Sequence, residues 1–512
     1  MGEALLSSLT QLLQPQTLLL MLIGVAVGFA VGILPGLGGA VTLALMLPFA
    51  VGLEPVQAFA FLLGMLAVTS TAGDITSVLF GVPGEATSAA TVLDGHPMTK
   101  RGEAGRALGA VLSASALGAA FGAIVLVAVI PIVRPLVLAF GPAEFFALTI
   151  LGLTFVVALS GAKILRGLLM ALFGVLVAMI GIDAQEGVPR YAFGELYLWA
   201  GIPLVPLVVG LFGGAELLQL MMTKGSINRS GKAVSDAVAA GEEVRASGMS
   251  ALLSGVRDTF AHWWLVIRSG AIGVAVGMMP GVGGSVAQFL AYGHAQQTSR
   301  RPEEFGTGAI EGVIAAGASN NAKDSGALVP TVAFGIPGGA ATAVLLSAFL
   351  VVGLDPGPEM LTTDLDVTLS MAWIVILANV VAVAIALLTV RHLVKLTDVP
   401  STYIVPALLV LLTIGTYTAS NNFGDVLVML CAAGIGVVCV RWNWPRVPFL
   451  LAVVLGSIAE RYLFLSVSLY GAEWLTRPTV VVIGVIAALA LLRPLLRRRR
   501  AVRSATTSGS PR

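Results

Sequence analysis

The residues that could perform chemistry in this chain lie in two polar segments, each followed by a Pro-Gly pair within apolar sequence. The first segment contains Asp74, and the second contains the Asn320-Asn321 pair, Lys323 and Asp324. An ionisable side chain is costly to place in a bilayer and therefore indicates a functional site. Asp74 and Asp324 could hold Na⁺, relay a proton or contact a substrate, and Lys323 could neutralise Asp324 or bind an anion. The alternative is that some of them lie at the membrane interface and are solvated.

Four Pro-Gly pairs interrupt the apolar stretches, at Pro35-Gly36, Pro83-Gly84, Pro280-Gly281 and Pro337-Gly338. Proline removes a backbone donor and clashes with the preceding helical turn, and glycine allows conformations that are closed to other residues. Interrupted backbone at membrane depth is tolerated only where it is buried in protein or lines a wet cavity. We therefore expect the four interruptions to meet around one central cavity. The alternative is that the small residues only allow helices to pack closely.

The helix starts that follow such interruptions would suit an anion, because they expose unpaired N–H groups and a positive dipole end. Helix ends offer carbonyl groups, which suit Na⁺. Small hydroxylated residues after the interruptions could donate hydrogen bonds to a carboxylate, namely Thr42, Thr87, Ser88, Thr91, Ser285 and Thr342.

The predicted substrate site gathers the residues of the four interruptions, the hydroxyls nearest to one of them and the asparagine pair. It comprises Pro35, Gly36, Gly38, Gly39, Pro83, Gly84, Thr87, Ser88, Pro280, Gly281, Gly283, Gly284, Asn320, Asn321, Pro337 and Gly338. Asp74 and Asp324 are the predicted ion-coupling residues. His96 and His294 have no second histidine at ligand spacing, so we expect no metal site, and we expect no cofactor beyond a coupling Na⁺ or H⁺.

Membrane-spanning helices must position these residues. The chain has 512 residues, of which 57% are hydrophobic and only 11% charged, against about 25% charged in soluble domains. Its apolar residues fall in long runs, such as 111–133, 367–390, 426–440 and 480–492, and about 20 apolar residues span a bilayer. The sequence thus predicts an all-α polytopic membrane protein with broken, partly re-entrant helices. A net charge of +2 argues against a nucleic-acid partner.

An internal repeat divides the chain. Residues 28–39 and 273–284 both read G-x-x-x-G-x-x-P-G-x-G-G, and residues 80–84 and 334–338 both read F-G-x-P-G. Two motifs in the same order indicate two homologous halves. We therefore divide the chain into membrane repeats at 1–240 and 241–503, followed by a disordered tail at 504–512.

The basic residues predict how the halves are oriented, because lysine and arginine favour the cytoplasmic side. The segment after the first F-G-x-P-G is basic around Lys100, whereas the segment after the second, 353–366, has no basic residue. Equivalent points on opposite sides predict an inverted repeat, with an external N-terminus and a cytoplasmic C-terminus. The polar stretch 224–244 would be a cytoplasmic linker, and residues 94–98 would form a cytoplasmic turn.

Several of these motifs resemble the large membrane subunit of tripartite tricarboxylate transporters, the TctA family. The resemblance extends from about Gly24 to Arg477 and rests on residues 32–39, 80–98 (FGVPGEATSAATVLDGHPM), 319–322, 334–338 and 353–358. It implies a secondary transporter of the bacterial cytoplasmic (inner) membrane that imports a small, tricarboxylate-like carboxylate. It also implies a small membrane subunit, a periplasmic solute-binding protein that hands over the carboxylate, and an ion gradient as the driving force.

The chain departs from the family pattern at two places near the expected cavity. Ala316-Gly317 stand where members often carry Pro-Glu, and Thr71-Ala72-Gly73 stand where members often carry Tyr-Gly-Gly. These changes bear on the substrate and the coupling ion more than on the fold, and Asp74 could supply the acidic group that Gly317 lacks. Two alternatives remain open: a channel or facilitator for small organic anions, and a membrane-embedded enzyme. We expect no enzyme, because no nucleophile–base pair is evident.

Overall fold

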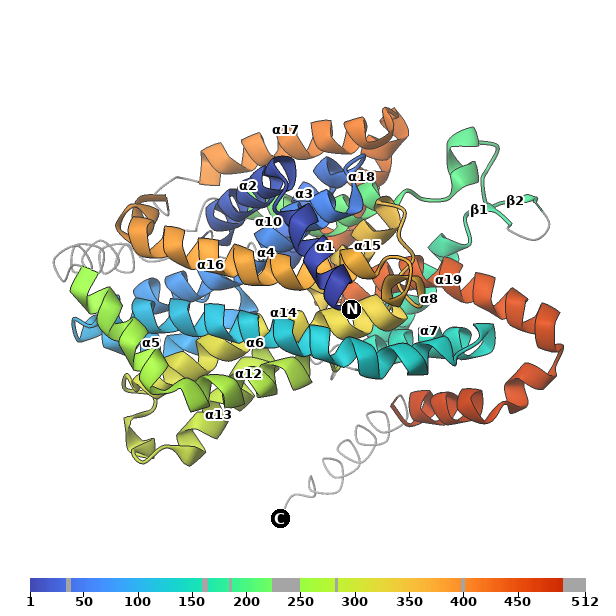
Figure 1. Ribbon diagram of the computed structural model, residues 1–512. Coiled ribbons are helices and arrows are strands. Elements are labelled where there is room, and N and C mark those ends of the chain that lie inside the picture. Colours follow the sequence, from blue (N-terminus) through green and yellow to red (C-terminus); the bar gives the residue numbers. More distant parts are fainter. Residues whose placement is uncertain are drawn as a thin grey trace, which may run out of the picture.

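The computed structural model is almost entirely helical and describes residues 1–33, 38–158, 164–183, 187–222, 249–280, 284–396 and 401–490. The first half contains α1 (Gly2–Leu12), α2 (Pro15–Gly32), α3 (Gly39–Met46), α4 (Pro55–Phe80), α5 (Thr91–Lys100), α6 (Ala104–Leu138), α7 (Pro142–Ala158), α8 (Ile164–Ala178), α9 (Leu204–Val208) and α10 (Ala215–Met222). A small antiparallel hairpin, β1 (Gly181–Ile182) with β2 (Pro189–Arg190), projects from the bundle (Figure 1). The predicted linker 224–244 and tail 504–512 lie outside the described residues.

The second half begins with a helix over Met249–Ala261. It continues with α12 (Trp263–Gly277), α13 (Gly284–Thr298), α14 (Ile310–Phe334), α15 (Ala340–Val351), α16 (Leu365–Leu396), α17 (Ser401–Ser420), α18 (Phe423–Arg441) and α19 (Val447–Tyr470). A last apolar helix covers Pro478–Ala490.

Six of the described helices are long and apolar enough to cross a membrane, namely α2, α4, α6, α16 over Leu365–Leu387, α18 and α19. The helix over Met249–Ala261 and α12 would add a seventh span, bent by 76°. The predicted apolar runs 111–133, 367–390 and 426–440 fall within α6, α16 and α18. The protein is therefore a multi-pass membrane protein, as the composition indicated.

The outer helices expose apolar side chains that a soluble protein would bury. Ile124 and Ile132 of α6 are 62% and 74% exposed, and Leu427 and Leu430 of α18 are more than half exposed. In contrast, nearly every side chain of α4 is buried, including those of its polar residues. The outer faces therefore suit lipid, whereas the polar residues of α4 face other helices.

The helices are interrupted at all four motif positions. In each half a helix ends three residues before the proline of a Pro-Gly-x-Gly-Gly motif: α2 ends at Gly32 before Pro35, and α12 ends at Gly277 before Pro280. The next helices, α3 and α13, begin at the last glycine of each motif. Residues 34–37 and 281–283, between these helices, lie outside the described part. The helices α4 and α14 end at Gly81 and Gly335, whose φ values of 64° and 65° are left-handed. Glycine suits that conformation because it has no Cβ.

The two halves also share their helix packing. Gly81 corresponds to Gly335 in the repeat, so Met65 of α4 corresponds to Ser319 of α14. Gly28 of α2 lies against the carbonyl of Met65, and its counterpart Gly273 of α12 lies against the carbonyl of Ser319. One turn further on, Gly32 lies against Thr69 and Gly277 lies against Lys323, again at corresponding positions. Small residues at these crossings let the backbones approach closely.

The loops form two groups at opposite ends of the bundle (Figure 1). At one end, the Arg101 guanidinium after α5 donates a hydrogen bond of 2.6 Å to the carbonyl of Gly308 before α14. At the other end, Arg190 of β2 forms an ion pair of 2.8 Å with Glu460 of α19. The first end lies next to the basic segment around Lys100, and the second lies next to the segment 353–366, whose Asp355 pairs with Arg461 of α19. These two segments were predicted to lie on opposite sides of the membrane, and the sidedness itself stays a prediction.

Candidate functional site

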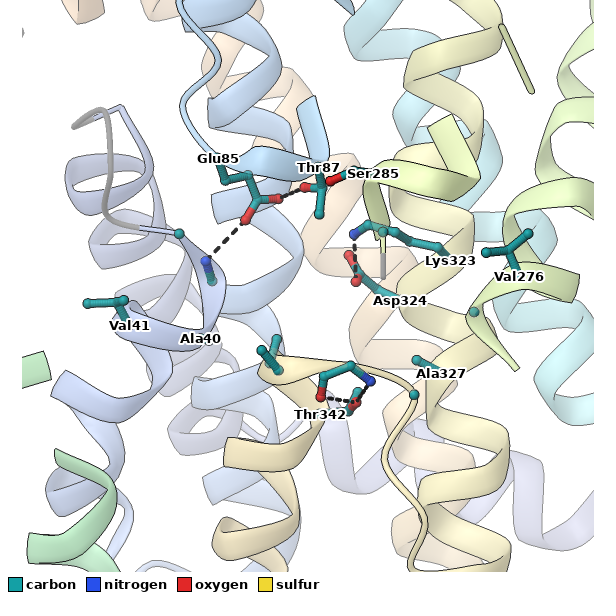
Figure 2. A pocket seen from close by; sticks show the side chains of 18 of the residues that line it. Ala40, Val41, Glu85, Thr87, Val276, Ser285, Lys323, Asp324, Ala327 and Thr342 are labelled. Carbon is teal, nitrogen blue, oxygen red and sulfur yellow. Dashed lines mark hydrogen bonds and ion pairs between the residues drawn. The ribbon is translucent and has the colours of Figure 1, made fainter. Parts of the chain in front are cut away.

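A cavity of about 500 Å³ lies where the interrupted segments of both halves meet. Its walls are the starts of α3, α13 and α15, the segment after α4, and one face of α14 with the end of α12 (Figure 2). The lining residues are Gly38, Gly39, Ala40, Val41, Pro83, Gly84, Glu85, Thr87, Val276, Gly277, Gly284, Ser285, Lys323, Asp324, Ala327, Gly338, Gly339, Ala340, Ala341 and Thr342.

The sequence-predicted site residues divide into three groups. The cavity is lined by Gly38, Gly39, Pro83, Gly84, Thr87, Gly284, Gly338 and Asp324. Four further residues are buried but do not line the cavity, namely Ser88, Asn320, Asn321 and Asp74. Two of the motif prolines, Pro280 and Pro337, do not line it either. Pro35, Gly36, Gly281 and Gly283 lie outside the described residues. The structure thus brings part of each repeat to one cavity and sets the asparagine pair and Asp74 apart from it.

Close backbone packing explains why glycine occupies two of the lining positions. A Cβ on Gly84 would lie 2.6 Å from the Cα of Gly73, and a Cβ on Gly338 would lie 2.5 Å from the carbonyl oxygen of Gly277. Neither obstacle is a flexible side chain, so neither can move aside. The Pro-Gly pairs therefore let the segments after α4 and α14 approach the neighbouring helices.

The charged groups of the second half form a pair on the cavity wall. The Lys323 ammonium lies 2.8 Å from Asp324 Oδ1, and Asp324 Oδ2 accepts a hydrogen bond of 3.1 Å from the Ser70 hydroxyl. Lys323 is only 6% exposed, and its side chain passes so close to Gly284 that a Cβ there would overlap it. Figure 2 shows Lys323 and Asp324 pointing toward each other beside the cavity. A lysine in this position can offer its charge to an anion at the start of α13.

The first half contributes a carboxylate, Glu85, which the sequence reasoning did not select. Its Oε2 accepts a hydrogen bond of 3.1 Å from the backbone N–H of Gly39, at the start of α3. Its Oε1 accepts from the Thr87 hydroxyl. A carboxylate on a helix start is favourable because of the free N–H groups and the helix dipole. The signal was present in the sequence, because Glu85 directly follows Pro83-Gly84.

Asp74 lies at the centre of a separate buried cluster. Asp74 Oδ1 accepts a hydrogen bond of 2.7 Å from Thr91, and Oδ2 accepts one of 3.0 Å from the Asn320 amide. Gln288 of α13 lies 3.5 Å from Oδ1. These partners are neutral and come from both halves. Asn320 has a further oxygen, Oδ1, that is buried with no hydrogen-bond partner. The cluster therefore has the composition of a small cation or proton site.

Asn321 connects three helices rather than facing the cavity. Its amide donates a hydrogen bond of 2.8 Å to Thr71 of α4 and another to Asn379 of α16. The Asn379 amide in turn donates a hydrogen bond of 2.8 Å to the carbonyl of Val375 in its own helix. Both polar atoms of the Asn379 side chain therefore have partners. The amide of Asn321 thus ties α14 to α4 and α16, whereas its Oδ1 is buried with no hydrogen-bond partner.

Asp94 corrects a prediction. The segment 94–98 does not form a turn but lies within α5, and Asp94 is fully buried. Asp94 Oδ1 accepts hydrogen bonds of 2.8, 2.8 and 2.9 Å from the backbone N–H groups of Gly306, Gly308 and Ala309, just before α14. The tertiary structure supplies these partners from the other half of the chain, so no local pattern could reveal them. Asp94 therefore clamps the first half to the start of α14.

The chain is similar in sequence to a known protein family and to two proteins of Agrobacterium vitis. Residues 18–451 match the model of the tripartite tricarboxylate transporter TctA family. The chain is 30% identical over 498 residues to a protein of Agrobacterium vitis described as "uncharacterized 52.8 kDa protein in TAR-I ttuC' 3'region", with 95% of each chain covered. A second Agrobacterium vitis protein, "uncharacterized protein in TAR-II ttuC' 3'region", is 29% identical over 234 residues, which are 44% of this chain and 97% of that relative. No solved structure matches the chain.

Proposed function

The chain belongs to the tripartite tricarboxylate transporter TctA family, and from this premise we propose that it is the membrane subunit that imports a small carboxylate. One observation carries the proposal. Interrupted helices from both halves meet around a cavity of about 500 Å³ that contains the buried ammonium of Lys323. Discontinuous helices at a repeat interface are where many secondary transporters bind their substrates.

The substrate carboxylate would lie at the helix starts that face this cavity. The start of α3 already holds Glu85, whereas the start of α13 lies beside Lys323. The hydroxyls of Thr87, Ser285 and Thr342 line the same space. Those of Thr87 and Thr342 donate to Glu85 and to the Gly339 carbonyl, so each would have to exchange that bond to orient a carboxylate.

An inverted repeat around this cavity would provide alternating access. One contact supports it: Ser70 and Asp324, which occupy corresponding positions in the two halves, 254 residues apart, are hydrogen-bonded to each other. Two corresponding residues meet in this way when the halves are related by a two-fold axis that passes between them. We therefore propose an axis between α4 and α14. The inverted sense of the repeat, with an external N-terminus and a cytoplasmic C-terminus, is proposed from the loop charges.

The import would be coupled to a Na⁺ or H⁺ gradient through Asp324 and Asp74. Asp324 touches the cavity, and Asp74 lies in the neutral cluster behind it. A small membrane subunit and a periplasmic solute-binding protein would complete the transporter in the bacterial cytoplasmic membrane. The binding protein would deliver the carboxylate to the end of the bundle that carries the β1–β2 hairpin.

Uptake into proteoliposomes tests the proposal. The purified chain would be reconstituted with its small subunit and binding protein, and uptake of radiolabelled mono-, di- and tricarboxylates would be measured under separate Na⁺ and H⁺ gradients. We expect saturable uptake of at least one carboxylate that requires one of the two gradients. Flux that neither saturates nor needs a gradient would instead indicate a channel.

Asp324→Asn is the variant that tests coupling. Because an amide at this position cannot balance the charge of a cation, gradient-driven uptake per folded protein should fall at least tenfold. The variant leaves Lys323 without its partner, so the folded amount is measured by size-exclusion chromatography. Asp258→Asn is the matched control, since Asp258 pairs with Arg106 away from the cavity. Unimpaired uptake by Asp324→Asn would remove this carboxylate from the mechanism.

A further inference from the structure

Lys323 is the one basic residue among the described residues that line the cavity. The other two charged lining residues, Glu85 and Asp324, are acidic. An anionic substrate that enters this cavity therefore meets a single ammonium group, and that group is already paired with Asp324 at 2.8 Å.

The two acidic residues differ in how firmly they are held. Both carboxylate oxygens of Glu85 have partners within the first half, the Gly39 N–H and the Thr87 hydroxyl. Asp324 has Lys323 on one oxygen and only the Ser70 hydroxyl on the other. Asp324 is therefore the carboxylate that loses its counter-charge if Lys323 changes partner.

Loss of the partner would leave Asp324 as an uncompensated charge in a largely buried place. Removing one member of a buried ion pair is strongly destabilising, because the remaining charge loses its counter-ion while it is still poorly hydrated; the Asp324 side chain is only 21% exposed. The arrangement is stable only if a cation reaches Asp324 when an anion reaches Lys323. Substrate binding and cation binding would then depend on each other, as reciprocal linkage requires.

We propose that the substrate carboxylate displaces Asp324 from Lys323, and that the released Asp324 carboxylate binds the coupling cation. Lys323 is thereby the residue that selects an anionic substrate, and Asp324 links each bound carboxylate to one cation. If the cation is a proton, it is bound on a carboxylate oxygen of Asp324; if it is Na⁺, the Ser70 hydroxyl can be a ligand. This exchange rests on the proposed function and specifies how its site couples the two solutes.

The repeat indicates that the exchange occurs in one half only. The positions that correspond to Lys323 and Asp324 are Thr69 and Ser70, which carry no charge, and the Thr69 hydroxyl donates to the carbonyl of Met65 in its own helix. The first half therefore has no second ammonium for a second carboxylate. We therefore expect one exchange of Asp324 for a substrate carboxylate on Lys323 in each transport cycle.

Equilibrium binding to the full-length protein in lipid nanodiscs tests the exchange. Acetate, succinate and citrate serve as mono-, di- and tricarboxylate probes, each titrated with and without Na⁺ and at two pH values. For the wild type we expect at least one probe to bind at least tenfold more weakly when the coupling cation is withheld. Asp324→Asn should bind that probe with the same affinity whether or not the cation is present, because Lys323 is no longer engaged. Lys323→Met should lose at least a hundredfold in affinity.

The double variant Lys323→Met/Asp324→Asn keeps the test decisive if Lys323→Met does not fold. It removes both charges and leaves no unpaired one, so it should fold, as judged by size-exclusion chromatography, and still fail to bind the probe. Asp258→Asn should retain the wild-type affinity and its cation dependence. The exchange is overturned if Asp324→Asn keeps the tenfold cation dependence, or if the folded double variant binds within threefold of the wild type. If the wild type binds none of the three probes, the proposed carboxylate transport fails as well.

Discussion

The two halves of the chain use corresponding backbone positions around the cavity but place different chemical groups on them. Glu85 of the first half corresponds to Gly339 of the second, and the N–H groups of both donate to a hydroxyl three residues later, Ser88 Oγ at 3.4 Å and Thr342 Oγ1 at 2.9 Å. The backbone frame is thus repeated, whereas the carboxylate is present on one side only. The Lys323–Asp324 pair is likewise present on one side only.

This difference separates the residues that build the cavity from those that determine what it binds. Glycine recurs at corresponding positions of both halves, such as Gly84 and Gly338, because a Cβ there would collide with neighbouring backbone. Charge differs between the halves, so an anion in the cavity would meet an asymmetric set of groups. Among the residues that line the cavity, variants at repeated glycines should therefore affect folding, and variants at unmatched charged positions should affect binding.

The largest effect is expected at a repeated glycine. Gly338→Ala places a methyl group against the carbonyl of Gly277, and the obstacle is backbone, so we expect destabilisation of more than about 3 kcal/mol, at or beyond the usual cost of overpacking. The neighbouring Gly339→Ala is the matched control, because nothing lies within 4 Å of a Cβ there. Thermal unfolding in detergent, followed by tryptophan fluorescence, compares the two. Equal melting temperatures would contradict the packing described for the segment after α14.

A smaller loss is expected at the clamp between the halves. Asp94→Ala removes the acceptor of three buried backbone N–H groups, and we expect a loss of about 2–3 kcal/mol, since unsatisfied buried donors are costly. Glu304→Ala, which removes only an exposed pair with Arg301, should change stability by about 0.5 kcal/mol or less. The same unfolding measurement applies. If Asp94→Ala were as stable as Glu304→Ala, the clamp would have no energetic role.

The smallest effect is expected at the unmatched carboxylate of the first half. Glu85→Gln keeps an oxygen that can accept from the Gly39 N–H but removes a negative charge from the cavity. Binding of an anionic substrate should strengthen by about 1 kcal/mol, roughly fivefold, from the loss of repulsion. Titration of the transported carboxylate measures this change, with Glu103→Gln as the control because Glu103 pairs with Arg106 elsewhere. Weaker binding would mean that Glu85 contacts the substrate through a proton or a cation.

Much of the fold could be predicted from local sequence. Long apolar runs predicted α6, α16 and α18 because an element that contacts lipid must be apolar along its length. The Pro-Gly motifs correctly predicted where the helices are interrupted, because proline and glycine act on the backbone at their own positions. The orientation of the repeats relative to the membrane rests on charge statistics and stays a prediction.

The candidate site was less accessible to sequence reasoning. Glu85 was passed over although it follows a Pro-Gly pair, and the asparagine pair was placed in the substrate site although the structure turns Asn321 toward Thr71 and Asn379. Whether a polar side chain on a buried helix faces a cavity or another helix depends on the rotation of that helix. Because α4 and α14 are buried on nearly all sides, their sequences have no single apolar face, and this rotation cannot be inferred from an amphipathic pattern.

By itself, the sequence determined that this protein spans a membrane, that two motifs recur in the same order along it and that its helices break at Pro-Gly pairs, because each of these properties arises from the composition or backbone chemistry of a contiguous segment. Only the tertiary structure decided that Lys323, Glu85 and Asp324 line one cavity, that Asp74 is hydrogen-bonded to Thr91 and Asn320, and that Asp94 holds the start of α14. These contacts join residues far apart in the chain, and their geometry follows from how the helices pack rather than from any local pattern.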